Sequence, residues 1–373
     1  MNSLRVLVLG TDKLILHEGS VSSRRQIDNF KNFEYVKIVV LGSNSASTFQ
    51  SGHVHIVSYG ATNRIVSFVK SFFILLRDIR KNTYDIIYTQ DVLYCGIAGY
   101  LLSRFCKTIL ITQLHGDYLD NPLWINQRFE NRFLNISGKF LIKKSDYVRC
   151  VSSRIATYVI ETLGKDSNRV VSLPIGVNGD EFNPQGVDNG HVRNHNLIFC
   201  GRLIEEKQPL FCCEIMIPIL QKYPDFTAVF IGEGKLKSAI VKKFTDAGLT
   251  NRLEMPGFLD THAVAQYYKN GFALIHTAFW EGWGLPMVEA SCCGLPVLTT
   301  DTGCAGEVII NDLNGVVIQG SRSDEYVAAL EKMIVNKEFY GMLCANGSRL
   351  GSKWTSTTMQ LEIEKFLEHA VEK

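Results

Sequence analysis

The stretch Trp280-Glu-Gly-Trp-Gly-Leu-Pro-Met-Val-Glu-Ala-Ser-Cys-Cys-Gly294 decides the fold expected for this chain. The apolar run 272–278 before it predicts a buried strand. Pro286 suits the first position of a helix, where its missing N–H is not needed. The stretch therefore predicts a strand, a glycine turn and a helix, with Glu281 in the glycine turn and Glu289 in the first turn of the helix.

The same stretch has the chemistry of a nucleotide-sugar site. The free N–H groups and the dipole of a helix N-terminus favour an anion, typically a phosphate. Gly282 and Gly284 let a ligand approach the backbone closely. Glu281 and Glu289 can accept hydrogen bonds from hydroxyl groups, and phosphate flanked by hydroxyls is the shape of a nucleotide sugar. The alternative is that Glu289 only complements the helix dipole and that Glu281 is a solvated turn residue.

The composition predicts a soluble protein of two domains. A chain of 373 residues is too long for one ordinary core. Its hydrophobic content of 46% and charged content of 20% are typical of globular proteins. A net charge of +2 without a basic run gives no reason to expect nucleic acid as a partner. With no signal peptide and no apolar run of membrane-spanning length, we expect a cytoplasmic protein.

The cysteines predict neither disulfide bonds nor a zinc site. Of the ten, Cys200, the pair at 212–213 and the pair at 292–293 lie in strand-like or helix-like runs, and no Cys-x-x-Cys spacing occurs. Reduced, buried thiols of a cytosolic protein are the simplest account. No Asp-x-Asp occurs either, so we expect no metal at a diphosphate.

Strand-like runs alternate with helical stretches in both halves of the chain. The first half has such runs at 4–10, 36–41, 54–57, 84–89, 108–114, 147–151 and 170–173. The second half has them at 196–203, 226–231, 253–257, 273–278, 296–300 and 316–318. This alternation predicts an α/β protein with two doubly wound, Rossmann-like sheets. We expect a first domain at 1–175 and a second at 190–350, joined by the Pro-, Gly- and Asn-rich crossing 174–195.

Polar residues of the first half mark its candidate ligand edge. His115-Gly-Asp117 follows a strand, and open α/β sheets bind ligands at the carboxyl ends of their strands. The alternative for His115 is a structural role. The loop after the first strand carries Gly19, and Ser22 or Ser23 is expected to cap the helix that follows.

One helical stretch of the first half has two interpretations. Residues 65–80 are rich in Phe and Leu and include Lys70, Arg77 and Arg80. The stretch either packs in the core or forms a surface helix that touches anionic lipid. In the second case the protein would work at the inner face of a membrane.

Cations follow the first strand of the second half. Arg202, after Gly201, and Lys207 supply a planar fork and a mobile point charge, which together suit a diphosphate. The alternative is two solvated surface cations. Gly232-Glu-Gly234 is a phosphate-approach turn that lacks the full G-x-G-x-x-G pattern, so a nicotinamide cofactor is not supported. The P-loop pattern is also missing, and we expect no cofactor.

Several motifs in order resemble the family 4 retaining glycosyltransferases, which have the GT-B fold of two Rossmann-like domains facing across a cleft. They are Gly201-Arg-Leu-Ile-Glu-Glu-Lys207, Phe230-Ile-Gly-Glu-Gly234, Pro256-Gly257, Glu281 to Glu289, Gly294-Leu-Pro-Val297, Gly306-Glu-Val-Ile309 and Asn314-Gly315. His115-Gly116, Ser152 and Ile175-Gly-Val-Asn178 resemble the family more loosely. In such a fold the C-terminal helix at about 354–373 would pack back on the first domain.

The resemblance implies roles for the residues that bind the donor. Arg202 and Lys207 would clamp its diphosphate, and Glu289 would hold the ribose hydroxyls. Glu281 would hold hydroxyls of the transferred sugar. Further donor contacts would come from Gly201, Gly232, Phe258 and the turn residues Gly282, Trp283, Gly284 and Leu285.

The first domain would supply the acceptor side. His115 would reach the sugar, and Gly19 and Asp117 are the weaker candidates there. The family often has two adjacent glycines in the loop where this chain has only Gly19. It often has Gly-Gly where this chain has Gly303-Cys-Ala-Gly306.

The expected activity is transfer of a hexose-type sugar, with retention, from a nucleotide sugar to a saccharide or lipid-linked acceptor in the synthesis of a surface polysaccharide or glycan. A sugar-nucleotide epimerase of the same fold and a non-catalytic nucleotide-sugar-binding protein are the alternatives. A phosphorylase would carry a pyridoxal-binding lysine motif, which we do not find.

Overall fold

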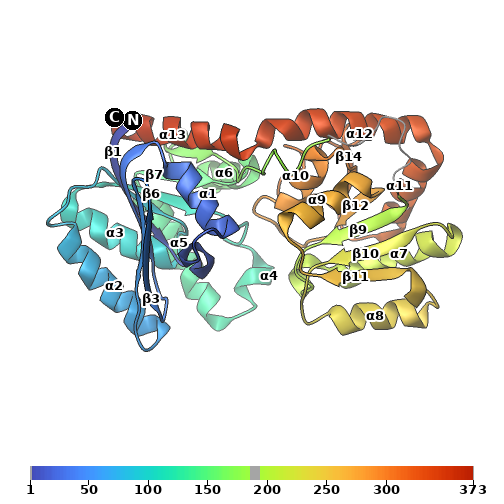
Figure 1. Cartoon of the computed structure of the whole chain (residues 1–373), viewed down its shortest axis with the longest axis horizontal. Coiled ribbons are helices and arrows are strands. Elements are labelled where there is room, and N and C mark those ends of the chain that lie inside the picture. The colour runs from blue at the N-terminus through green and yellow to red at the C-terminus, as the bar shows by residue number, and fades with distance from the viewer. Residues whose placement is uncertain (1, 185–193, 373) are drawn as a thin grey trace. The chain divides into compact units, whose positions relative to one another are not determined.

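The computed structural model describes residues 2–184 and 194–372, and these form two compact units. The first unit ends at Pro174 and regains the C-terminal segment from Thr357 onward, and the second spans Ile175–Ser356 (Figure 1). Part of the expected crossing 174–195, and the expected start of a domain at 190, lie outside the described residues.

The first unit is built on one sheet with the strand order β3-β4-β2-β1-β5-β6-β7-β8. Its strands are β1 (Asn2–Gly10), β2 (Phe33–Val40), β3 (Ala46–Ser51), β4 (Val54–Tyr59), β5 (Ile86–Thr89), β6 (Ile109–Leu114), β7 (Tyr147–Cys150) and β8 (Val170–Ser172). Its α-helices are α1 (Val21–Phe30), α2 (Arg64–Asp78), α3 (Tyr94–Cys106), α4 (Pro122–Ile125), α5 (Phe129–Lys144), α6 (Ser153–Thr157) and α13 (Ser356–Glu372). All pairs are parallel except β3 with β4.

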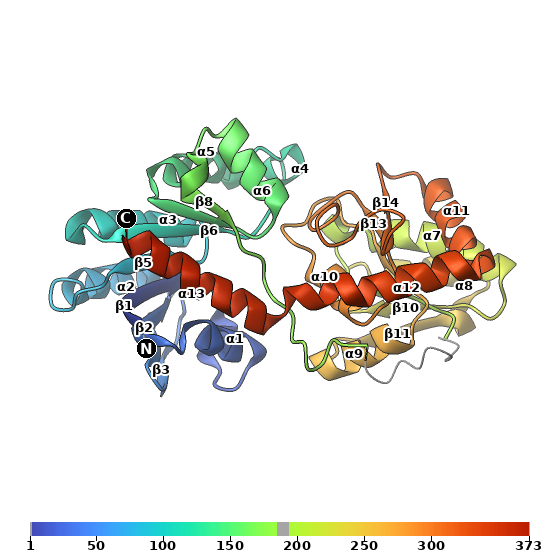
Figure 2. The same ribbon diagram turned by 90° about the horizontal axis from the view of Figure 1, so that it is seen from above.

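Alternate residues of the central strand β1 are buried in two separate hydrophobic cores. Val6 and Val8 of β1 pack with residues of α1 and α13, including Leu367. Leu7 and Leu9 face the other way and pack with residues of α2 and α3. Because side chains alternate along a strand, an apolar run such as β1 must be covered on both faces. Figure 2 shows α13 lying along the sheet of this unit.

Two details of the first unit differ from the sequence predictions. The edge strand β3 was not predicted, because its side chains are mostly exposed and polar and give no apolar alternation. The helix α1 is capped by Ser20, whose hydroxyl accepts a hydrogen bond from the N–H of Ser23 at 3.0 Å. The prediction of Ser22 or Ser23 as the cap is wrong, since the helix begins earlier, at Val21.

The second unit contains a fully parallel sheet with the order β11-β10-β9-β12-β13-β14. Its strands are β9 (Asn196–Cys200), β10 (Thr227–Ile231), β11 (Leu253–Gly257), β12 (Ala273–His276), β13 (Val297–Thr300) and β14 (Gly315–Ile318). Its α-helices are α7 (Pro209–Lys222), α8 (Lys237–Asp246), α9 (Thr261–Asn270), α10 (Leu285–Cys292), α11 (Ser323–Val335) and α12 (Lys337–Gly351). The strand order reverses between β9 and β12, which is where such sheets form a ligand crevice.

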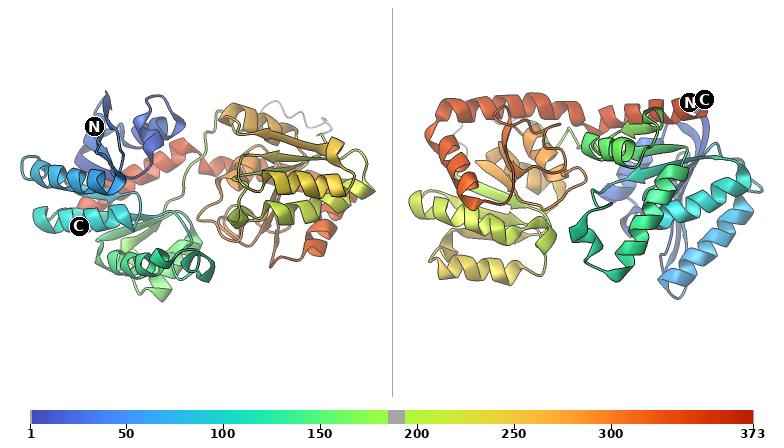
Figure 3. Two further views of the ribbon diagram at one scale, coloured as in Figure 1. Left: turned by 90° about the horizontal axis from the view of Figure 1, so that it is seen from below. Right: turned by 180° about the vertical axis from the view of Figure 1, so that it is seen from behind.

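Helices cover both faces of this second sheet. Leu197 and Phe199 of β9 pack with α7, α8 and α11 in one large core. On the other face, α9 contacts β9 and α10 contacts β12 and β13. Figure 3 shows the parallel strands between these two helical layers. All ten cysteines are free thiols, and seven are buried.

The key helix begins one residue earlier than the sequence analysis placed it. Gly284 is the N-cap of α10, so Leu285 is its first residue and Pro286 its second. Proline is tolerated there because the N–H groups of the first turn have no partner within the helix. Glu289 therefore lies in the second turn and not in the first.

Candidate functional site

A cavity of about 510 Å³ opens at the carboxyl ends of β9 and β10 in the second unit. Its lining combines backbone, apolar and charged groups: Phe182, Cys200, Gly201, Arg202, Ile231, Gly232, Glu233, Phe258, Leu259, Thr261, Val264 and Glu289. Five of these twelve, namely Gly201, Arg202, Gly232, Phe258 and Glu289, are predicted donor-site residues.

A bare backbone forms one wall of the cavity. Gly232 has φ +131°, a conformation that side-chain-bearing residues rarely adopt. A Cβ atom at Gly232 would lie 2.0 Å from the carbonyl oxygen of Gly201. Only glycine therefore fits at this position, where the ends of β9 and β10 meet.

Glu289 brings a carboxylate into the cavity without a protein partner. Its carboxylate makes no hydrogen bond or ion pair within residues 2–184 and 194–372, and the residue is partly buried. Burial raises the pKa of Glu289 to about 7. A group in this state can take up hydrogen bonds from a ligand, because nothing in the described chain satisfies it.

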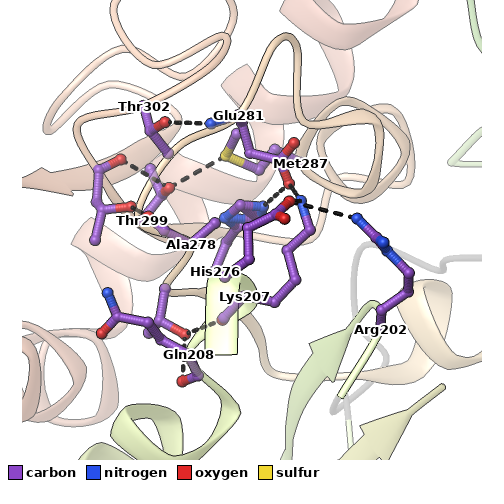
Figure 4. Close-up of polar contacts among 12 residues, drawn as sticks. Arg202, Lys207, Gln208, His276, Ala278, Glu281, Met287, Thr299 and Thr302 are labelled. Atoms are coloured by element: carbon purple, nitrogen blue, oxygen red, sulfur yellow. Dashed lines mark hydrogen bonds and ion pairs between the residues drawn. The ribbon is translucent and has the colours of Figure 1, made fainter. Parts of the chain in front are cut away.

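Arg202 and Lys207 are joined through an acid that the sequence analysis did not select. Glu206 Oε1 lies 3.4 Å from Arg202 Nη2 and 3.6 Å from Lys207 Nζ. The side chain of Arg202 is 67% exposed, whereas that of Lys207 is 15% exposed. Glu206 therefore links Arg202, on the cavity wall, to Lys207, which belongs to a more buried group of charges. Figure 4 shows Lys207 close to Glu281 and His276.

Lys207, Glu281 and His276 form that buried group. Lys207 Nζ donates to Glu281 Oε1 in a charged hydrogen bond. The ring of His276 lies 3.2 Å from the same oxygen through Nε2. Burial lowers the pKa of His276 to about 3, and the charge of Lys207 acts in the same direction. The ring is therefore neutral, and its Nε2–H donates because a carboxylate can only accept.

The position of Glu281 is fixed by the turn around it. Its backbone N–H donates to Thr302 Oγ1 at 2.8 Å. The N–H groups of Gly282, Trp283, Gly284 and Leu285 make no hydrogen bond within the described part of the chain. Free N–H groups in a row before a helix are suited to an anion.

The indole of Trp283 is turned away from the cavity. Its side chain is buried and its ring meets that of Trp354 edge-on, with centroids 5.3 Å apart. Only the backbone of Trp283 is left for a ligand. Gly284 has φ +82°, which is easy for glycine and lets the chain turn sharply into α10.

Several residues of this site were not predicted from the sequence. His276 is the last residue of the buried strand β12. It is a polar residue within an apolar run, and that run predicted only a strand. Glu206 directly precedes Lys207, and its charge next to a candidate cation is the signal that could have identified it. Phe182 belongs to the cavity through tertiary contact alone and gives no signal in the sequence.

The predicted site residues of the first unit lie in two places. His115 and Asp117 follow the carboxyl end of β6, and Gly19 lies in the loop before α1. His115 Nε2 lies 2.9 Å from Gln113 Oε1. Desolvation lowers the pKa of His115 to about 3, aided by the charges of Arg149 and Arg25. Burial raises the pKa of Asp117. Gly19 has φ +77° and lies in the loop before α1. No hydrogen bond or ion pair joins Gly19, His115 and Asp117 to one another within the described residues.

The described residues contain no group of three His, Cys, Asp or Glu side chains placed as metal ligands. None of the helices in the described part of the chain is long and apolar enough to span a bilayer.

Known proteins resemble this chain along most of its length. A family profile described as glycosyl transferases group 1 matches residues 189–349, and one described as glycosyltransferase family 4 matches residues 35–181. An uncharacterised glycosyltransferase of Methanocaldococcus jannaschii is 24% identical over 344 residues, which is 92% of each chain.

A second relative has a defined activity. The UDP-Gal:α-D-GlcNAc-diphosphoundecaprenol α-1,3-galactosyltransferase of Escherichia coli is 23% identical over 286 residues, which cover 73% of this chain and 72% of that protein. Among solved structures, Anabaena HepE in complex with UDP and glucose has a TM-score of 0.75 at 18% identity, over 98% of this chain and 99% of that one. At this identity the likeness shows the fold.

Proposed function

The chain belongs to the family 4 glycosyltransferases and has the GT-B fold, and on this premise we propose a specific reaction for it. The protein transfers a hexose-type sugar from a nucleotide-diphosphate sugar to a hydroxyl group of a saccharide or lipid-linked acceptor, and the anomeric configuration is retained. The cavity in the second unit takes the nucleotide.

The partnerless carboxylate of Glu289 carries this proposal. A buried carboxylate without a hydrogen bond is costly unless a ligand supplies one. A ribose offers two neighbouring hydroxyl donors that fit the two oxygens of one carboxylate. Phe258, which is 85% exposed beside the cavity, offers an aromatic face to the base.

The diphosphate would exchange places with acids of the protein. Arg202 and Lys207 are neutralised by Glu206 and Glu281 in the free chain. A bound diphosphate brings two or more negative charges of its own, so both cations can turn to it without being left unpaired. Glu281 and Glu206 are then released to accept hydrogen bonds from the hydroxyls of the transferred sugar.

The same cations serve the chemical step. Negative charge develops on the leaving diphosphate oxygen as the sugar–oxygen bond breaks, and fixed positive charge there stabilises the transition state. With retention, the leaving oxygen takes the proton of the acceptor hydroxyl on the same face of the sugar. Lys207 and Arg202 supply the countercharge, and no metal ion is needed.

The donor and acceptor are proposed from the relatives. Since the galactosyltransferase named above uses UDP-Gal and a diphosphoundecaprenol-linked sugar, we propose a UDP-hexose as donor and a saccharide on a lipid diphosphate as acceptor. Such an acceptor places the reaction in surface-polysaccharide synthesis at the inner face of a membrane, with the protein as a peripheral, cytoplasmic partner.

Thermal unfolding with UDP-, GDP- and ADP-sugars tests donor binding first. We expect only the UDP-sugar to raise the Tm, because a ligand that binds the folded chain alone stabilises it. Release of UDP is then measured with and without acceptor in the presence of a chelator. Acceptor-dependent release with an α-linked product from an α-linked donor supports the proposal. Epimerised donor without acceptor, or binding without release, contradicts it.

A further inference from the structure

Exposed apolar side chains gather on three helices of the first unit. Of the 21 large apolar side chains that are exposed among the described residues, twelve belong to α2, α3 and α5. Their exposed fractions reach 77% at Ile65, 64% at Phe105 and 74% at Phe129. A soluble monomer rarely leaves so much contiguous apolar surface in water, and such surfaces mark interaction sites.

These side chains form one stripe along each helix. On α5 they are Phe129, Phe133, Ile136 and Phe140, which follow one another by four, three and four residues. That spacing keeps all four on a single side of a helix. On α3 the stripe is Tyr94, Ile97, Leu101 and Phe105, and on α2 it is Ile65, Val66, Val69 and Phe73.

The three stripes are continuous with one another. α3 contacts both α2 and α5, and Figure 3 shows the three helices side by side. The rings of Tyr100 on α3 and Phe140 on α5 meet edge-on at 5.9 Å. The guanidinium of Arg64 on α2 lies 5.6 Å from the ring of Tyr94 on α3. We call the twelve exposed side chains and the basic residues among them the α2–α3–α5 face.

Basic residues accompany the apolar stripes. The three helices contain eight lysines and arginines and two acids, whereas the whole chain has 39 and 37. Both acids are paired, Asp78 with Lys37 at 2.9 Å and Glu130 with Arg128 at 3.3 Å, and of the eight basic residues Lys139 is paired with Asp120 at 2.7 Å. The charged side chains of this face therefore carry a net positive charge.

The positive surplus decides which partner fits. A symmetric contact between two copies would bring each basic residue of this face against the same face of the other copy, and like charges repel. An anionic lipid surface offers negative headgroups to the basic residues and an apolar layer below them to the aromatic stripes. Arg132 and Lys143 lie on the exposed side of α5 among its Phe residues, as a helix lying in such an interface requires.

We propose that the α2–α3–α5 face binds the surface of an anionic lipid bilayer. The proposal extends the proposed function, since a bilayer is where a lipid-linked acceptor would be met, but the binding itself requires neither donor nor acceptor. It also replaces the two interpretations of 65–80 with one: α2 packs on the sheet through one side and presents Val69 and Phe73 through the other.

Flotation of the full chain with lipid vesicles tests the proposal. Vesicles of phosphatidylcholine alone are compared with vesicles of equal parts phosphatidylcholine and phosphatidylglycerol. We expect at least tenfold stronger binding to the anionic vesicles, weakened by salt. The double variant Phe133→Ser/Ile136→Ser should lose most of the binding, and Arg132→Glu/Lys143→Glu should lose the preference for the anionic vesicles.

The matched control is Val335→Ser/Leu361→Ser, which removes two exposed apolar side chains from α11 and α13. It should bind as the unchanged chain does. Three results would overturn the proposal. The unchanged chain does not bind anionic vesicles, or both variants of α5 bind them fully. The third result is that the unchanged chain is a dimer in solution and Phe133→Ser/Ile136→Ser is a monomer. Nucleotide-induced rises in Tm are measured in parallel, so that failure of lipid binding is told apart from failure of the glycosyltransferase assignment.

Discussion

The two units repeat one strand order but fill its crevice differently. β1 and β5 flank the reversal point of the first sheet as β9 and β12 flank that of the second. In the first unit, a Cβ on Gly10 would lie 2.1 Å from Gln90 Oε1, so the Gln90 side chain occupies the space at the end of β1. In the second unit the equivalent edge opens into the 510 Å³ cavity. The topology offers two crevices, and side chains decide which of them can hold a nucleotide.

The charges at the two edges differ in the same way. Arg149 of the first unit is buried and donates to four neutral acceptors, the carbonyl oxygens of Leu173 and Pro174, Tyr88 Oη and Gln113 Oε1. Arg202 and Lys207 of the second unit are held by carboxylates. An anionic ligand can replace a carboxylate at little cost, whereas replacing neutral acceptors deep in the fold would leave them unsatisfied. Arg149 is therefore committed to the fold of the first unit, whereas Arg202 and Lys207 are available to an anionic ligand.

The largest effect is expected when a cation is removed from the carboxyl edge of the sheet in the second unit. Lys207→Ala should lower kcat by about 100- to 1,000-fold, as removal of one preorganised charge at a developing oxyanion does. The measurement is steady-state turnover of UDP-sugar together with the Tm. Lys222→Ala, which removes an exposed ion pair with Glu331 from the same unit, should leave turnover unchanged. Unchanged turnover in Lys207→Ala, or an equal loss in both variants, would contradict a specific role for Lys207 at the second edge.

The next effect is expected at the carboxyl edge of the sheet in the first unit. It changes the stability of the fold but not the binding of the donor. Arg149→Met should lower the free energy of unfolding by about 3 kcal/mol, because buried acceptors lose their donor. The affinity of the remaining folded protein for UDP, measured by calorimetry, should stay as it was. Arg322→Met removes an exposed guanidinium paired with Asp324 and serves as the control with little change in Tm. A loss of UDP affinity in Arg149→Met would show that the first edge also serves the donor.

A smaller effect follows from the raised pKa of Glu289. The folded chain holds this proton up to a pKa of about 7, whereas the unfolded chain releases it near 4.5. Between these values the folded state binds more protons, so its stability falls as the pH rises. Glu289→Gln removes this dependence and should be more stable than the unchanged chain by about 2 kcal/mol at pH 8, with little difference at pH 4.

Thermal unfolding across pH 4–8 checks this result, and Glu338→Gln, on the exposed start of α12, is the control. The same Glu289→Gln variant should bind UDP more weakly, since an amide replaces one carboxylate oxygen by a donor. A parallel pH profile in the variant and the unchanged chain would contradict the account of Glu289 as an unsatisfied acid.

The smallest effect is expected at His276. His276→Ala removes one of the two donors that hold Glu281, while Lys207 remains. Turnover should fall about tenfold, which corresponds to about 1.4 kcal/mol of transition-state stabilisation. Because the residue positions another side chain, kcat should fall while the KM for the donor changes little. A fall in donor affinity with unchanged kcat would assign His276 to binding instead.

Most of the architecture was predictable from local patterns. Apolar runs predicted every strand except β3, whose exposed polar side chains leave no pattern to detect. The glycine turn and the helix after it were predicted, although α10 begins at Leu285 and Glu289 therefore lies one residue further into the helix than expected. Strand and helix periodicity depends on neighbours in the chain, and for this reason it survives in the sequence.

The site itself was only half predictable. The sequence determined which chemistry this protein carries: two cations, two acids, bare glycines and a helix start, all in the second half of the chain. The tertiary structure alone decided which of these groups meet. It paired Lys207 with Glu281 across 74 residues, inserted Glu206 between the two cations and left Glu289 without a partner in a cavity. Contacts of this kind depend on how sheets and helices pack, because the distance between two side chains in space is not set by their distance along the chain.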